Sequence, residues 1–176
     1  SLVLNGSIIV GGRLILEKYF GVEAFGGFSF ALNTNLIANQ IVLSFSQVFY
    51  PILKSINKEK FESTIMALQK AISIISALLL VSYFAVYLLV SVLYFKYSNI
   101  LEYLMYLYPL FIFQAKYSLI VLNTQKIDKN MKALIVDNCV GVIMNISLCY
   151  ISYIVFGNVK SIAMATLIGY IIWYYY

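Results

Sequence analysis

The 176-residue sequence contains no histidine, and only 11% of its residues are charged. Histidine is the commonest metal ligand of proteins and a frequent general base, so many catalytic and metal-binding classes are disfavoured. The two cysteines, Cys139 and Cys149, have neither the spacing of a zinc site nor the number that a disulfide framework needs. We therefore expect neither an enzyme nor a protein that holds a metal or cofactor.

The scarcity of charge is matched by an excess of apolar residues. Hydrophobic residues make up 62% of the chain, whereas soluble domains are about 45 to 50% apolar and about 25% charged. Disorder is excluded as well, because aromatic residues make up 16% of the chain and disordered segments are poor in them. The net charge of +5 comes from lysines in short clusters between apolar runs. Such clusters favour anionic membrane lipid, and not nucleic acid, as the partner.

Uncharged runs recur along the chain, and each is long enough for a helix that crosses a membrane. Residues 24–53, 71–95 and 138–159 carry no charge, and a spanning helix needs about 20 predominantly apolar residues. The runs lack the alternating segments of about 10 residues that are typical of a membrane β-barrel. The sequence predicts an all-α integral membrane protein with six transmembrane helices, at residues 2–20, 28–52, 65–94, 100–123, 133–156 and 161–176.

The lysines between these helices predict their orientation. The second and fourth links hold six lysines, and the other three links hold three. Cytoplasmic links are the richer in Lys and Arg, so we place the second and fourth links in the cytoplasm and run the first helix from inside to outside. The six lysines are Lys54, Lys58, Lys60, Lys126, Lys129 and Lys132.

The two ends of the chain predict a piece of a longer protein. The last predicted helix has 16 residues, and at about 1.5 Å per residue it covers roughly 24 Å of a membrane core that is roughly 30 Å thick. The chain begins at Ser1 without the basic segment and cleavage site of a signal peptide. We expect residues 1–176 to form one lobe of a larger protein, with its last helix truncated.

The second predicted helix carries a stripe of polar residues. At about 100° per residue, Asn33, Gln40, Ser44 and Gln47 fall on one side of the helix. Polar side chains are costly in lipid, so the stripe favours the wall of a wet cavity. The alternative is hydrogen bonding between packed helices, in which amides hold neighbouring spans together.

Two cations lie where lipid should not tolerate them. Lys116 lies ten residues before Lys126, which places it about 15 Å deep, next to Gln114. It is either a cavity cation that binds an anionic substrate or the partner of Asp137 in an ion pair, and both hold if the pair opens when substrate arrives. Arg13 lies one turn from Glu17, so an interfacial ion pair competes with a functional role.

The order of these motifs resembles a known family. Residues 11–61 contain Arg13 followed by aliphatic residues, then a glycine-containing turn, then a polar helix that ends at Pro51. This segment resembles the seventh and eighth helices of the bacterial polysaccharide flippases, the Wzx-type oligosaccharide transporters of the multidrug/oligosaccharidyl-lipid/polysaccharide exporter superfamily. Residues 107–150 resemble the tenth and eleventh helices of that family.

The resemblance implies a two-lobe transporter of the bacterial cytoplasmic (inner) membrane, in which this chain pairs with an N-terminal lobe. Its task would be to flip undecaprenyl-pyrophosphate-linked oligosaccharide to the outer leaflet for O-antigen, lipopolysaccharide or another surface polysaccharide, driven by an ion gradient. Arg13 and Lys116 would contact the pyrophosphate, while Asn33, Gln40, Ser44, Gln47 and Gln114 would line the cavity. Further partners would be a polysaccharide polymerase and other assembly proteins. The family commonly has Asp where this chain has Gly12.

Two other functions compete with this one. A drug exporter of the same superfamily would need a cavity carboxylate for cationic drugs, for which Asp137 is the candidate. A membrane-embedded polysaccharide-assembly enzyme would need a carboxylate pair or metal ligands near an interface. Glu23 and Glu102 form no such cluster in the sequence.

Overall fold

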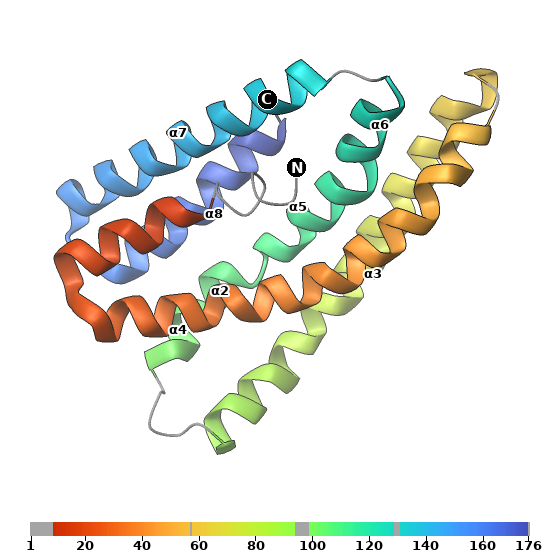
Figure 1. The fold of residues 1–176 in the computed structure, drawn as a ribbon. Coiled ribbons are helices and arrows are strands. Elements are labelled where there is room, and N and C mark those ends of the chain that lie inside the picture. Colours follow the sequence, from red (N-terminus) through yellow and green to blue (C-terminus); the bar gives the residue numbers. More distant parts are fainter. Residues whose placement is uncertain (1–8, 57, 94–98, 129–130, 176) are drawn as a thin grey trace.

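The computed structural model describes residues 9–56, 58–93, 99–128 and 131–175, which are helical apart from short links and contain no strand. The all-α expectation is therefore confirmed for the described residues. Their helices are α2 (Val10–Ser55), α3 (Lys58–Leu93), α4 (Asn99–Leu107), α5 (Leu110–Lys116), the π-helix η2 (Tyr117–Val121), α6 (Leu122–Ile127), α7 (Met131–Phe156) and α8 (Val159–Tyr175). Figure 1 shows α2 and α3 as two long helices connected at one end of the molecule.

Helix α2 is a hairpin of two arms, residues 10–20 and 22–55, that reverse direction at Gly21 (Figure 1). Gly21 has φ 84° and ψ 177°, a backbone conformation that side chains other than hydrogen disfavour. The arms then approach closely at Gly12, where an added Cβ would lie 2.9 Å from the Phe28 ring. Gly21 thus allows the turn, and Gly12 allows the two arms to pack closely after it.

Helices α4, α5, η2 and α6 follow one another as a single rod, which is broken between α4 and α5. Proline has no N–H to donate, and α4 ends at Leu107 while α5 begins at Leu110, on either side of Pro109. Further on, η2 inserts a π turn without interrupting the rod. A proline inside a helix is a recognised cause of such a break, whereas nothing in the sequence indicates the π turn.

Three of the helices are long and apolar enough to cross a membrane: Lys60–Leu93, Ile100–Ile127 and Lys132–Phe156. Val159–Tyr175 is apolar but shorter. The described residues of the six predicted ranges are helical apart from Ile9, Tyr108 and Pro109; residues 2–8, Tyr94 and Tyr176 lie outside the described residues. A membrane protein is supported by the three long apolar helices, while the count of six spans stays a prediction.

Described residues beside the first, third and fifth links lie close together at one end of the molecule. The Lys160 ammonium lies 3.0 Å from the Glu102 carboxylate. At the same end Tyr19, before the Gly21 turn, stacks on Tyr153 with ring centroids 4.3 Å apart. The ends of α2 and α6, which precede the second and fourth links, lie toward the other end of the molecule (Figure 1). Lys96 and Lys129 lie outside the described residues.

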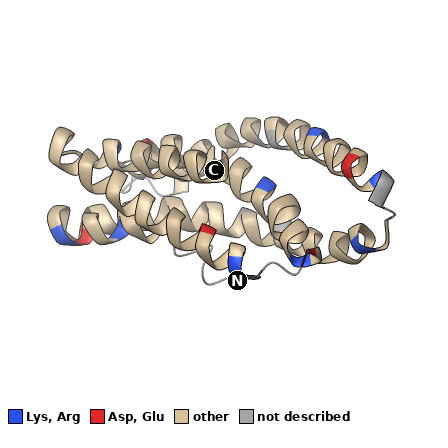
Figure 2. Ribbon diagram, turned by 90° about the horizontal axis from the view of Figure 1, so that it is seen from above, with Lys and Arg blue, Asp and Glu red and all other residues tan. Residues whose placement is uncertain are grey.

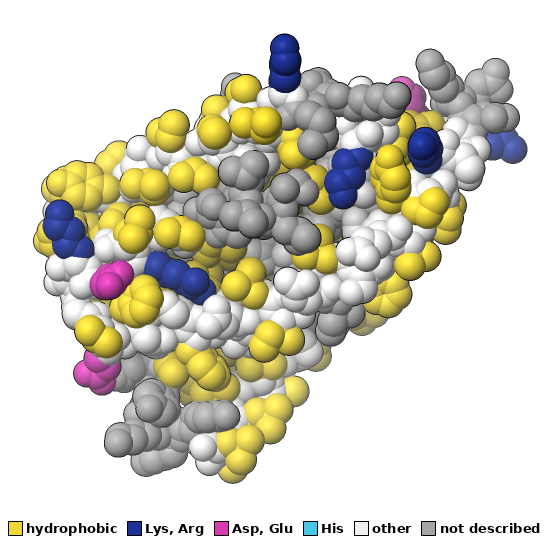
Figure 3. Space-filling view, viewed as in Figure 1, with side chains coloured by type: hydrophobic (Ala, Val, Ile, Leu, Met, Phe, Trp, Pro, Cys, Tyr) yellow, Lys and Arg dark blue, Asp and Glu magenta, His cyan; other side chains and the backbone are white. Residues whose placement is uncertain are grey.

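Apolar side chains occupy both the core and the surface. Leu16, Leu104 and Tyr170 are fully buried where α2, α4 and α8 meet. On α3, by contrast, Phe84 is 67% and Val92 75% exposed. Figure 2 shows few charges along the helices, and Figure 3 shows apolar side chains spread over one face. A soluble monomer rarely exposes so much apolar surface, but a helix in contact with lipid does.

Candidate functional site

Lys116 lines a groove between α3, α5 and α8, which we call the Lys116 groove. The groove has a volume of about 690 Å³. Lys116 is the last residue of α5 and is half-buried, well inside the long apolar helix Ile100–Ile127. The other polar residues of the groove are Gln69, Lys70, Ser73, Tyr174 and Tyr175.

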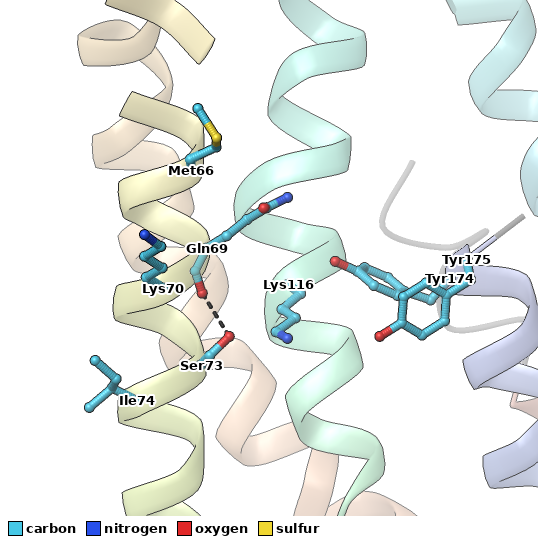
Figure 4. Close-up of a pocket in the computed structure, with 8 residues that line it drawn as sticks. All are labelled: Met66, Gln69, Lys70, Ser73, Ile74, Lys116, Tyr174 and Tyr175. Carbon is cyan, nitrogen blue, oxygen red and sulfur yellow. Dashed lines mark hydrogen bonds between the residues drawn. The ribbon is translucent and has the colours of Figure 1, made fainter. Parts of the chain in front are cut away.

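The groove is lined by cations, hydroxyls and an amide, with no acidic residue among those that the structure assigns to it. In Figure 4 the Gln69 side chain extends from α3 toward α5, and Lys70 points away from α5. The Ser73 hydroxyl donates to the backbone carbonyl of Gln69 at 2.8 Å. On the opposite wall the ring of Tyr174 packs edge-on against that of Tyr175, 5.1 Å apart. Such a lining suits an anion that also accepts hydrogen bonds.

Lys116 does not pair with Asp137 in the described part of the chain. One oxygen of the Asp137 carboxylate accepts a hydrogen bond from Gln125 at 2.7 Å, and the Asp137 carbonyl accepts one from Trp173 at 2.6 Å. Gln125 lies nine residues beyond Lys116, which is about 13 Å along a helix. The Asp137 carboxylate is therefore engaged by Gln125, and the Lys116 charge is left to the groove.

Arg13 joins the two arms of the α2 hairpin. Its guanidinium donates to the side-chain amide oxygen of Asn33 (Oδ1) at 2.9 Å, while its Nε is buried without a partner in the described structure. The sequence selected both residues but did not predict that they bond each other. Arg13 is not among the residues of the Lys116 groove, so the structure does not bring the two predicted cations to one groove.

The polar residues of α2 are divided between two faces. Gln40, Ser44 and Gln47 are exposed and line a second groove, against α6. Asn35, Asn39 and Ser46, which are four and seven residues apart, are buried against the rod instead. Three residues of the predicted stripe thus line a groove, while a separate set packs against the rod, and the spacing of that buried set could have identified it.

The buried set bonds to two irregular places of the rod. The break at Pro109 frees the Leu107 carbonyl from its helical partner, and Asn35 donates to it at 2.8 Å. Ser46 donates to the Ser118 carbonyl in η2 at 2.8 Å. These bonds pin the long arm of α2 to the kink and the π turn.

Gln114 was expected to line the cavity, but the structure buries it. Its side chain is 2% exposed and lines neither groove. Its Oε1 has no hydrogen-bond partner in the described structure. Gln114 therefore belongs to the packed interior of the bundle, one helical turn before Ser118.

Comparison with known proteins identified no match for the chain. No protein-family model matches it, and no curated protein or solved structure is significantly similar to it. What the grooves can do has to be argued from their own residues.

Proposed function

We propose that this chain is the C-terminal lobe of a transporter that flips undecaprenyl-pyrophosphate-linked oligosaccharide across the bacterial cytoplasmic membrane. The observation that carries the proposal is Lys116, a half-buried cation inside a long apolar helix that opens into a groove without acidic residues. A charge in that position costs free energy unless it serves a ligand or a partner. The resemblance of residues 11–61 and 107–150 to the flippases adds the substrate class.

The chemistry of the Lys116 groove fits a diphosphate. Phosphate oxygens accept charge-assisted hydrogen bonds from an ammonium group, and these strengthen where water is scarce. Gln69 and the tyrosine hydroxyls of α8 supply further donors in the same groove. Lys116 is therefore assigned the first contact with the diphosphate. Arg13, bound to Asn33, is kept as the second cation that the resemblance implies.

The structure offers less support for a drug exporter. Such a protein would need an accessible carboxylate in its cavity, and Asp137 lines neither groove and is engaged by Gln125. The N-terminal lobe, the polymerase and the other assembly partners remain part of the proposal. The expected contacts of Gln40, Ser44 and Gln47 with sugar hydroxyls also stay a prediction, since these residues line the second groove.

Complementation of a bacterial strain that lacks its own flippase tests this function. Lys116→Ala in the full-length protein should abolish surface polysaccharide at normal protein levels, and Lys116→Arg should keep part of it. Lys18→Ala is the matched control, because Lys18 is exposed next to the Gly21 turn. Full complementation by Lys116→Ala would contradict the assignment of Lys116 as the residue that contacts the diphosphate. If that variant complements fully and Asp137→Asn instead abolishes drug resistance, drug export is the better function.

A further inference from the structure

The second groove lies between the long arm of α2 and α6, and we call it the Lys126 groove. It has a volume of about 370 Å³ and shares no lining residue with the Lys116 groove. Two of its polar residues, Asn123 and Lys126, belong to α6. The others belong to α2 and are Gln40, Ser44, Ser46, Gln47 and Tyr50. Lys126 is one residue from the end of the apolar helix Ile100–Ile127. The groove therefore opens at the level where a membrane's headgroups begin.

The inner wall of this groove holds an unpaired acceptor. Asn123 is 1% exposed, and its amide nitrogen donates to the Ser46 hydroxyl and to the Leu119 carbonyl, both at 3.0 Å. Its Oδ1 has no partner in the described structure. Burying an acceptor without a donor costs about 1 to 3 kcal/mol. A ligand hydroxyl that enters the groove would supply the missing donor.

The outer rim of the groove holds an unpaired cation. Lys126 is exposed and forms no salt bridge with the carboxylates that the structure describes. The amides of Gln40 and Gln47 also line the groove and can both donate and accept. Tyr50 also lines the groove, and tyrosine is enriched at membrane interfaces. The groove thus offers a cation at the headgroup level and a hydroxyl acceptor behind it.

We propose that the Lys126 groove binds the headgroup of a hydroxyl-bearing anionic phospholipid, with phosphatidylglycerol as the type. The phosphate contacts Lys126, and a glycerol hydroxyl donates to Oδ1 of Asn123. Lys54, Lys58, Lys60 and Lys132 belong to the helix ends at this end of the bundle, and basic links attract the anionic cytoplasmic leaflet. The two residues that define the site, Lys126 and Asn123, are not among those assigned to the flipped substrate, so the site can be tested apart from the flippase function although Gln40, Ser44 and Gln47 line the same groove.

Lipid retention by the full-length protein tests the site. The protein is equilibrated in vesicles of equal parts dioleoyl phosphatidylglycerol and dioleoyl phosphatidylcholine, extracted in mild detergent, and the bound lipid is counted by native mass spectrometry. We expect retention of phosphatidylglycerol, and Lys126→Gln should lower its excess about fivefold. Lys132→Gln is the matched control, an exposed lysine of α7 at the same end that lies outside the groove. Equal loss from both variants would overturn the site.

Two further probes separate charge from hydroxyl recognition. Dioleoyl phosphatidic acid carries the phosphate without the glycerol hydroxyls, so it should be retained less than phosphatidylglycerol. Equal retention would overturn the role of Asn123. Soluble glycerol 3-phosphate should displace part of the bound lipid if the headgroup alone is recognised, and a complete failure to compete at millimolar concentration would overturn recognition through the headgroup.

Discussion

Asn123 donates a hydrogen bond to the Ser46 hydroxyl at 3.0 Å, and Ser46 in turn donates to the carbonyl of Ser118 at 2.8 Å. Ser118 and Asn123 are five residues apart, which in an α-helix would place them about 140° apart around the axis. A π-helix closes its hydrogen bonds over five residues, and η2 (Tyr117–Val121) contains Ser118 and ends two residues before Asn123. The π turn is therefore what lets one serine of α2 bond both residues.

Ser46→Ala should destabilise the bundle, because it removes a donor from the Ser118 carbonyl and an acceptor from the Asn123 amide. We expect a loss of about 0.6 to 2 kcal/mol, between the averages for hydrogen bonds in membrane bundles and for unsatisfied buried groups. Thermal unfolding in detergent measures it. The control is Ser44→Ala, whose exposed hydroxyl bonds only the Gln40 carbonyl of its own helix. A Ser44→Ala loss as large as that of Ser46→Ala would contradict the role of the buried seam.

Gly141→Ala should separate α7 from α8. An added Cβ at Gly141 would lie 2.6 Å from the Trp173 indole, whose N–H donates to the Asp137 carbonyl. We expect a loss of stability of about 1 to 3 kcal/mol, as for other overpacked sites, together with a change in Trp173 fluorescence. Gly26→Ala is the control, since nothing lies within 4 Å of its added Cβ. That variant should be stabilised by up to about 1 kcal/mol because alanine favours helix.

The hydrogen bond between Arg13 and Asn33 should appear as coupling between their substitutions. A double-mutant cycle of Arg13→Gln and Asn33→Ala should give about 0.6 to 1.7 kcal/mol, the range measured for bonds between membrane helices. The same unfolding assay applies. Pairing Asn33→Ala with Lys18→Ala, an exposed residue on the short arm, should give no coupling. Zero coupling for the first cycle would show that the bond does not hold the α2 hairpin together.

Cysteine labelling should reveal the alternating ends. In a background with Cys139 and Cys149 replaced by Ala, Glu23→Cys and Asn158→Cys should react with an impermeant maleimide added outside intact spheroplasts. Lys54→Cys and Asp128→Cys should react only after the membrane is opened. All four positions are exposed, two at each end of the bundle. Labelling of Glu23→Cys and Lys54→Cys from the same side would contradict both the predicted orientation and the six-span count.

Much of the helical layout follows from local patterns in the sequence. Charge placement along the chain indicated where the helices lie, and the rod breaks at Pro109, a residue type that interrupts helices. These features depend on residues that are near one another along the chain, so periodicity and composition suffice to find them. Bonds between distant segments were beyond such reasoning, as Arg13 and Asn33 illustrate.

The sequence by itself determined an all-α, apolar chain with a cation deep in its fourth predicted helix. Only the tertiary structure decided what each polar residue faces. The π turn at Tyr117–Val121 changes the phase of the rod, so Asn123 bonds Ser46. The packing of α7 against the rod brings the Asp137 carboxylate to Gln125. Lys116 is left without that partner and lines a groove. Phase and depth are set by how whole helices pack, and no local stretch of residues encodes them.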